Sequence, residues 1–205
     1  MHRTRIVSRV AGGVREAKKR ETRRALADAA LTLATERGLH GFTVDEVATR
    51  AGVSTRTFFN YFRSKEAAIG GLDPDELSAA AAALTDRPAD ESPLDALVAV
   101  LVPDAGVGDE VALHSRREAL INRHAELHAQ RLANERLVEE ALAAAMALRL
   151  DVSPVDPYPR VLVAATMAAL RVASAWYVEV RPPVPVESVL RDVVQQLAFG
   201  LRVRA

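Results

Sequence analysis

The stretch TVDEVATRAGVSTRTFFNYFRSK, from Thr43 to Lys65, decides the fold of this chain, because it predicts two short helices around a tight turn and a third helix directly after them. Thr43 and Glu46 have the spacing of a capping box, in which each side chain accepts a hydrogen bond from the other residue's backbone N–H. Gly52 predicts the end of the first helix, since glycine adopts a positive φ without steric cost. Hydroxyl side chains that can cap the next helix follow at once, so the turn is about three residues long and is typical of a helix-turn-helix.

The second helix of this motif has an aromatic side and a polar side. Phe58 and Phe62, at i and i+4, predict the buried side. Arg56 is the residue of this helix that can grip guanine O6 and N7 through two hydrogen bonds, a contact worth about 1–3 kcal/mol of discrimination. The alternative is that Arg56 is only a solvated charge. Phe59 is open between a place in the core and an apolar contact with a thymine methyl group.

Four runs of residues in this stretch carry a likeness to a known family: Thr43–Ala48, Ala51–Ser54, Thr57–Phe62 and Ser64–Glu66. On these residues the segment resembles the TetR family of bacterial transcriptional regulators. By position, the resemblance implies phosphate contacts from Thr43, Thr57, Tyr61 and Lys65, and base-edge contacts from Thr55, Arg56 and Asn60. The family usually shows Leu-Tyr-Tyr-His or a near variant at positions 58 to 61, where this chain has Phe-Phe-Asn-Tyr, so the partner of Asn60 stays open.

The charges of the chain are divided unevenly, although its net charge is zero. Residues 1–65 hold 14 Arg and Lys against 6 Asp and Glu, and residues 66–205 hold 13 against 21, so the two parts carry +8 and −8. Attraction to phosphate depends on local positive surface rather than on the net charge. The basic N-terminal third therefore fits a DNA partner, and the acidic remainder should stay off the duplex.

The composition and the N-terminal residues indicate in which compartment the protein is expected. The chain has no cysteine, which excludes disulfides and thiolate zinc sites and fits a cytoplasmic protein. The N-terminal residues 1–13 are basic, with no apolar segment of signal-peptide length after them. We interpret them as a flexible arm in which Arg3, Arg5 and Arg9 contact phosphates or a minor groove and Gly12 and Gly13 form a hinge. A disordered, solvated tail is the equal alternative.

The pattern along the rest of the chain is helical throughout, which predicts an all-α fold of about nine helices. A first long helix is expected from about Val14 to Arg37, with Ala25 among its buried residues. It completes a three-helix DNA-binding domain over residues 14–65. Gly70-Gly71 and Asp73-Pro74 predict a break after the helix that begins at Ser64. Residues 66–205 are then expected to form an antiparallel helical bundle for ligand binding and dimerisation.

The last two predicted helices are the most apolar. Residues 161–178 approach the length of a membrane span, but Arg171 in their middle and the flanking prolines indicate a helix buried in protein rather than in a membrane. The final helix has one apolar face, which includes Leu190, Val194 and Leu197. Together the two helices predict a homodimer interface of four helices, with intrachain packing as the alternative; the TetR resemblance favours the dimer.

A second resemblance covers residues 114–176 and rests on Arg116–Ile121, Ala125–Leu127, Asp156–Arg160 and Ala169–Ala173. On these residues the chain is similar to the C-terminal domain of mycofactocin-type TetR regulators, and the resemblance implies an acyl-CoA-like effector. Ala125 stands where those sequences often carry proline. Six candidate effector-binding residues follow, each with a structural role as the alternative: Arg116, Arg117, Asn122, Met167, Arg171 and Trp176.

Metal binding and catalysis have little support in the sequence. His124 and His128 could share a helical face, with His114 and Glu118 nearby, but the pattern is weak and we expect neither a metal nor a cofactor. No catalytic motif stands out, so we expect a regulator rather than an enzyme. The TetR resemblance implies a repressor that a small ligand releases from operator DNA, with an activator as the alternative. Its rivals are a ligand-independent architectural DNA binder and a helical enzyme or metal protein.

Overall fold

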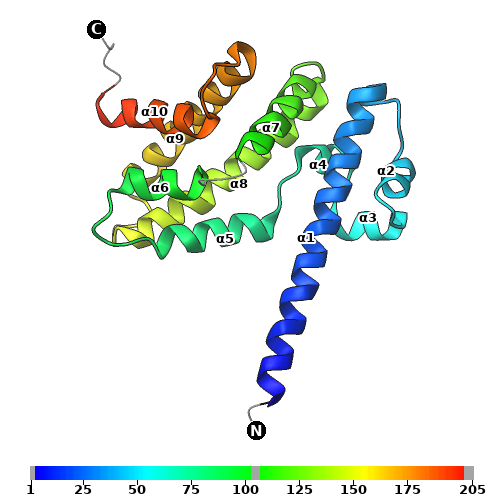
Figure 1. Cartoon of the computed structure of the whole chain (residues 1–205), viewed down its shortest axis with the longest axis horizontal. Coiled ribbons are helices and arrows are strands. Elements are labelled where there is room, and N and C mark those ends of the chain that lie inside the picture. The colour runs from blue at the N-terminus through cyan, green and yellow to red at the C-terminus, as the bar shows by residue number, and fades with distance from the viewer. Residues whose placement is uncertain (1–2, 103–106, 201–205) are drawn as a thin grey trace. The chain divides into compact units, whose positions relative to one another are not determined.

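The computed structural model describes the backbone of residues 3–102 and 107–200, and the side chains of residues 15–102, 111–113 and 115–200. Within these ranges the chain is all-α, as predicted, and has ten helices (Figure 1). They are α1 Arg3–Arg37, α2 Val44–Arg50, α3 Thr55–Tyr61, α4 Lys65–Gly70, α5 Pro74–Thr85, α6 Pro93–Leu101, α7 Val107–Ile121, α8 Ala125–Arg149, α9 Pro157–Val180 and α10 Val186–Ala198.

The first helix is longer than the sequence predicted. It begins at Arg3 and continues through Gly12 and Gly13, so most of the expected flexible arm is helical, while residues 1 and 2 lie outside the described residues. Each glycine costs about 1 kcal/mol relative to alanine in a helix, so this pair favours the predicted hinge. Extending an existing helix is much easier than nucleating one, so a long packed helix can continue across such a pair. The helix ends before Gly38, whose φ is +76°.

The described chain divides into two compact units, one reaching to Asp73 and including Leu120–Arg131, the other made of Pro74–Ala119 and the residues from Leu132 onward. The first unit extends past the boundary expected at residue 65, because α4 packs along α1. It also takes in the turn between α7 and α8, where His40 Nε2 lies 3.4 Å from Glu126 Oε1. The break predicted after Gly70-Gly71 is present, since α4 ends at a left-handed Gly71 and α5 begins at Pro74.

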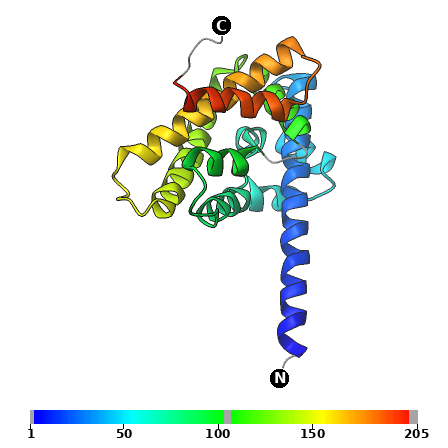
Figure 2. The ribbon, with the colours of Figure 1, turned by 60° about the vertical axis from the view of Figure 1, so that its left-hand side comes forward.

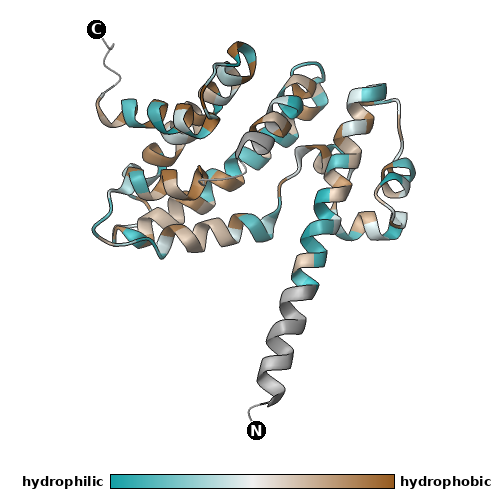
Figure 3. Ribbon diagram, viewed as in Figure 1, coloured by the Kyte–Doolittle hydropathy of each residue, from teal (hydrophilic) through white to brown (hydrophobic). Residues whose placement is uncertain are grey.

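The core of the first unit is built on α1, which packs against α2 and α4 while α2 packs against α3 (Figure 1). Phe58 and Phe62 are buried, as their spacing predicted, and Phe58 is fully buried. Ala25 is exposed, contrary to prediction, because the buried face of α1 runs through the neighbouring Leu26 and Ala27. In Figure 3 the ribbon of α1 is hydrophilic along its middle and more apolar where it runs beside the other helices of this unit.

Arg23 connects three elements of the first unit. Its guanidinium donates to the carbonyl oxygen of Leu72 at 3.0 Å and lies 3.7 Å from the carboxylate of Asp73. It also lies 4.6 Å from the ring centre of Phe62 and 5.9 Å from that of Tyr61. One half-buried arginine therefore joins α1, the end of α3 and the segment that leads into α5.

The second unit has two clusters of buried side chains. One joins α5, α6, α8 and α9 and includes Leu97, Met146 and Val163. The other joins α6, α7, α9 and α10 and includes Val102 and Leu190. In this unit α10 packs along α9, as Figure 2 also shows, and α6 contacts both of them. Both α6 and α9 contribute to the two clusters, so these two helices connect the halves of the unit's core.

Candidate nucleic-acid interface and ligand pocket

The helix-turn-helix is fixed at each helix start by a side-chain cap. Thr43 accepts from the backbone N–H of Glu46 at 3.3 Å, and the Glu46 carboxylate accepts from the Thr43 N–H at 2.8 Å, so the predicted capping box is present. Ser54 caps α3 by accepting from the N–H of Thr57 at 3.1 Å. Gly52, with φ +71°, makes the turn between the two helices. The starts of α2 and α3 are therefore fixed by local hydrogen bonds, and the turn between them contains one left-handed glycine.

A further hydrogen bond joins the two helices directly and was not predicted. Thr55 Oγ1 donates to Asp45 Oδ1 at 2.6 Å, between the first residue of α3 and the first turn of α2. The sequence placed Thr55 at a base edge, but the structure gives its hydroxyl a partner within the motif. The sequence contained one signal for this bond: an acidic residue in the first turn of a helix, with a hydroxyl residue ten positions later.

Three side chains extend from the outer surface of α3. Arg56 and Asn60 are exposed, and neither makes a hydrogen bond or ion pair with any residue that the structure describes. Phe59 is 55% exposed and packs edge-on against Phe58, with ring centres 5.4 Å apart, so it lies on the surface rather than in the core. A guanidinium, an amide and an aromatic ring are thus presented together on one short helix.

The other predicted DNA contacts are more engaged with the protein. Thr57 is half-buried and its hydroxyl lies 2.8 Å from that of Ser54. Tyr61 is half-buried beside Arg23, and Thr43 is exposed at its cap position. Lys65 Nζ donates to the carbonyl oxygens of Leu39 and Phe42 at 2.7 and 3.0 Å. These residues lie in the first or last turns of α2, α3 and α4 or at a cap.

Ion pairs between α1 and α2 set the charge state of this region. Arg50 donates twice to Glu36, at 2.7 and 2.9 Å, and these hydrogen bonds lower the pKa of Glu36 and raise that of Arg50. The pKa of Glu46 is lowered first by the Thr43 backbone N–H and then by Arg37, which lies 2.7 Å away. Both carboxylates are therefore held in their charged form.

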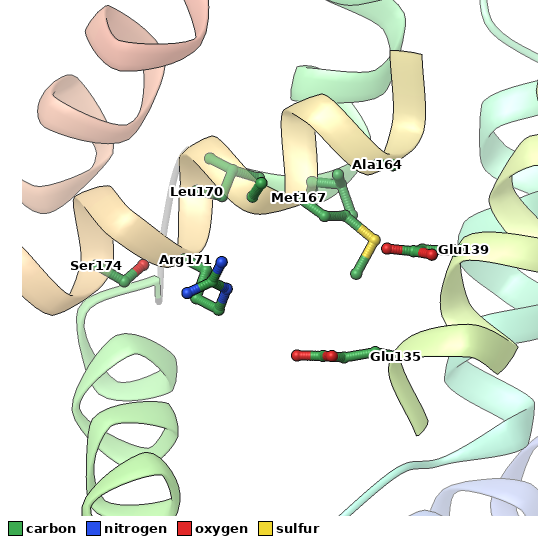
Figure 4. Close-up of a pocket in the computed structure, with 9 residues that line it drawn as sticks. Glu135, Glu139, Ala164, Met167, Leu170, Arg171 and Ser174 are labelled. Carbon is green, nitrogen blue, oxygen red and sulfur yellow. The ribbon is translucent and has the colours of Figure 1, made fainter. Parts of the chain in front are cut away.

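The second unit contains a cavity of about 330 Å³ among α6, α8 and α9. Its apolar lining consists of Leu101, Ala164, Met167, Ala168 and Leu170. Its polar lining consists of Glu135 and Glu139 from α8 and Arg171 and Ser174 from α9. Figure 4 shows the two carboxylates and the guanidinium pointing into the same space from opposite walls. An apolar cavity with a few convergent polar groups is the usual form of a small-molecule site.

This cavity includes two of the six predicted effector-binding residues, Met167 and Arg171. Arg116 and Asn122 are exposed on other parts of the chain, Arg117 is half-buried, and Trp176 is 44% exposed; none of these four lines the cavity. Sequence reasoning missed Glu135, Glu139 and Ser174. The repeat of glutamate at i and i+4 in α8 was a signal for one polar face, but it did not show what that face meets.

No group of three or more His, Cys, Asp or Glu side chains suited to a metal occurs among the side chains that the structure describes. The side chain of His114 lies outside them, and His124 packs edge-on to His40 with ring centres 6.3 Å apart.

Within the described ranges α9 is the one helix that is long and apolar enough to cross a membrane, judged by length and composition alone. Of its most apolar window, 22% is buried in the chain.

Comparisons with known proteins agree with the two-part organisation. Residues 26–68 match the family model of bacterial regulatory proteins of the tetR family, and residues 91–202 match that of the MftR C-terminal domain. The chain is 38% identical over 178 residues to the HTH-type transcriptional regulator TcmR of Streptomyces glaucescens, covering 80% of this chain and 77% of that protein.

Two solved structures share the fold at low sequence identity. The fatty acid degradation regulator FadR of Bacillus halodurans has a TM-score of 0.57 at 18% identity, with 89% of this chain and 97% of that chain covered. The regulator FadR of Bacillus subtilis, solved with stearoyl-CoA, has a TM-score of 0.51 at 16% identity, with 87% of this chain and 98% of that chain covered.

Proposed function

Since this chain belongs to the TetR family and is a transcriptional regulator, we propose that it is a repressor whose N-terminal unit binds operator DNA until a small ligand in the second unit releases it. One observation carries the proposal: α3 presents Arg56 and Asn60, free of protein partners among the described residues, from a helix that is capped and tied to α2. A recognition helix that is already held in one orientation loses little conformational entropy when it binds DNA.

In this proposal the DNA contacts of the N-terminal unit have separate roles. Arg56 and Asn60 read base edges, and Phe59 packs on a thymine methyl group. Thr43, Thr57, Tyr61 and Lys65 position the backbone phosphates, aided by the exposed basic residues of α1 from Arg15 to Arg20. Thr55 acts chiefly by holding α3 on α2, because its hydroxyl donates to Asp45.

We propose that two copies pair through the last two helices, so that two reading heads meet two half-sites. The support is an exposed stripe on α9 with the three- and four-residue spacing of a helix–helix seam. Its members are Tyr158, Val161, Ala165, Ala168, Val172 and Trp176. In this proposal the protein is cytoplasmic and binds DNA, not a membrane. The high hydropathy of α9 is then explained by a second copy that covers this stripe.

The cavity beside Met167 is the proposed effector site. A ligand that binds one arrangement of the dimer more tightly than the other shifts the population between them and so changes operator affinity. The likeness to mycofactocin-type regulators suggests an effector with an apolar chain such as an acyl group, and the apolar lining of the cavity accepts such a chain. The ligand seen with FadR of Bacillus subtilis belongs to the same chemical class.

The test measures specific and non-specific DNA affinity at one salt concentration, with the operator found by selection from random duplexes. Arg56→Ala should weaken specific binding about five- to 150-fold and leave non-specific binding nearly unchanged. Arg160→Ala, an exposed arginine at the start of α9, is the matched control. An architectural DNA binder would discriminate little between sequences and respond to no ligand. If Arg56→Ala leaves operator affinity unchanged, Arg56 does not read a base. That result would favour the alternative of an enzyme or metal protein.

A further inference from the structure

We propose that helix α8 transmits the state of the cavity to the DNA-binding unit, with His40 and Glu126 as the positioning residues at its start; the inference rests on the proposed function and names a path for its regulation. The first support is the division of α8 between the two units. Its residues up to Arg131 belong to the first unit, and those from Leu132 onward belong to the second. One helix is therefore part of both units.

The part of α8 beyond this division reaches the cavity. Glu135 and Glu139 line the cavity, and Figure 4 shows both side chains pointing into its space. From Glu126 to Glu135 the helix rises about 14 Å, at about 1.5 Å per residue. It contains neither glycine nor proline, the residues at which many helices kink. A displacement of α8 at the cavity should therefore move its start as well.

The segment Leu120–Arg131, which joins α7 to the first turns of α8, is compact and belongs to the first unit by its contacts. Leu120, Ile121 and Leu127 are buried in it, the last with 2% exposure. Two backbone hydrogen bonds of 3.1 Å close the turn, from the His124 N–H to the Ile121 carbonyl and from the Leu127 N–H to the His124 carbonyl. The segment can therefore move as one piece.

Polar contacts connect this segment to the loop between α1 and α2. His40 of that loop has its Nε2 3.4 Å from Glu126 Oε1, and its ring packs edge-on against that of His124, with ring centres 6.3 Å apart. The pKa of Glu126 is lowered, first by its own backbone N–H and also by His40 and His124. The side chains of His40 and Glu126 are more than half exposed, so breaking their contact leaves the cores intact.

The loop that holds His40 is fixed to residues proposed to meet DNA phosphates. The carbonyl oxygen of the buried Leu39 accepts from Lys65 Nζ at 2.7 Å. The carbonyl oxygen of Phe42 accepts from the same ammonium group at 3.0 Å, and Thr43, the cap of α2, follows it directly. A shift of the loop would therefore reach two phosphate contacts without passing through the base-reading side chains of α3.

The same loop has little freedom to absorb such a shift. A side chain at Gly41 would collide with the backbone of Arg37 at the end of α1. The Gly41 N–H donates to the Gly38 carbonyl at 3.1 Å, and the Gly38 N–H donates to the Ala34 carbonyl at 2.9 Å. Because the loop is folded tightly onto the end of α1, a push on His40 should move the loop as a unit.

Substitutions that fill the cavity replace the unidentified ligand in the test. Operator affinity is measured by fluorescence anisotropy on the full chain with and without Met167→Trp, on an operator selected from random duplexes. The substitution should change operator affinity at least about fivefold, the lower end of typical allosteric coupling. Ala164→Leu fills the same cavity from the same helix and provides a second measurement. The readout is the factor by which filling the cavity changes operator affinity.

Glu126→Lys then tests the contact with His40. It should lower this factor at least about twofold, since an exposed ion pair contributes about one and a half- to fivefold to an equilibrium constant. The exchanged pair, His40→Glu with Glu126→Lys, should restore the factor, because opposite charges again face each other at these positions. Each factor compares two proteins of equal charge, so a general electrostatic effect on DNA affinity cancels.

Glu140→Lys is the matched control. Glu140 also lies on α8, but it belongs to the second unit, pairs with Arg136 of the same helix at 2.8 Å and does not line the cavity. Its substitution makes the same change of charge as Glu126→Lys and should leave the factor unchanged. Circular dichroism melting confirms that each variant is folded before affinities are compared.

The outcomes distinguish this inference from the function it rests on. A factor that Glu126→Lys leaves unchanged, that Glu140→Lys lowers equally, or that the exchanged pair does not restore would overturn transmission through His40 and Glu126. Operator affinity that neither cavity-filling substitution changes would overturn transmission by α8, while operator binding itself would stand. Failure of the unsubstituted chain to bind any operator would remove the proposed function.

Discussion

Thr55 Oγ1 donates a 2.6 Å hydrogen bond to Asp45 Oδ1, so the residue that begins the reading helix is fastened to the helix before it. Both residues are at least partly accessible, and the bond crosses the turn made by Val53 and Gly52. The capping interactions of Thr43 and Ser54 hold each helix by its own backbone. The Thr55–Asp45 bond differs because it fixes one helix relative to the other.

Removing this bond should loosen α3 without removing a DNA contact. Asp45→Ala is expected to lower the free energy of unfolding by about 0.5–1.5 kcal/mol and to weaken operator binding, since the orientation of α3 is less well held. A double-mutant cycle with Thr55→Val, measured by urea unfolding, should give a coupling energy of similar size. Thr49→Ala, an exposed change on the same helix, should have little effect.

Phe59 should read thymine through its methyl group. Phe59→Ala is expected to weaken operator binding, and replacing one contacted thymine by deoxyuridine should weaken binding of the unsubstituted protein about fourfold, since a buried methyl group contributes about 0.8 kcal/mol. The same DNA change should not affect the Phe59→Ala protein. A deoxyuridine effect of equal size in both proteins would contradict the contact.

Lys65 should act on both stability and DNA binding. Because its ammonium group donates to Leu39 and Phe42, Lys65→Met is expected to lower the free energy of unfolding by about 1.5–3 kcal/mol. If its third N–H also meets a phosphate, the slope of log affinity against log salt falls by about 0.9, on all sequences alike. A stability loss with an unchanged salt slope would restrict Lys65 to a structural role.

The capping box should give the first unit a pH-dependent component of stability. The pKa of Glu46 is lowered in the folded state by the Thr43 N–H and Arg37, so its contribution is present above its unfolded pKa of about 4.3 and is lost as pH falls through the lower folded value. Glu46→Gln should therefore be less stable than the unsubstituted chain at pH 6. The difference should shrink between about pH 5 and pH 3, measured by urea unfolding.

The stripe on α9 should hold the dimer. Val172→Glu places a charge among apolar residues and is expected to raise the dimer dissociation constant at least about tenfold in sedimentation velocity, because burying an unpaired charge is costly. Val155→Glu is the matched control: Val155 is 85% exposed, in the loop before α9, and should leave the dimer intact. A Val172→Glu protein that sediments as a dimer would place the interface elsewhere.

The helix-turn-helix was predictable because its signals are local. A capping box, a turn glycine and two phenylalanines at i and i+4 each act within a few residues, and the structure has all of them. The partner of Thr55 was not predictable, because it depends on the angle between two helices. The prediction of a flexible arm with a hinge at Gly12 and Gly13, and of a helix from about Val14, is wrong, because a long helix can cross two unfavourable residues.

The cavity could be predicted only in part, for a related physical reason. Periodicity shows that Met167 and Arg171 share a side of α9, but it does not show which face of another helix lies opposite. Glu135 and Glu139 come from α8, on the other side of the cavity from α9, and Ser174 is a small residue in an apolar run. That these three residues line one cavity becomes visible only in the folded structure, where α8 and α9 lie on opposite sides of it.

The position of Arg23 has a consequence for genetics. It joins the rings at the end of α3 to Leu72 and Asp73, the last residues before α5 begins, so the segment that leads into the second unit is also held against the end of α3. A selection for alleles that keep their target gene silent in the presence of inducer should therefore return substitutions at Arg23 and Asp73.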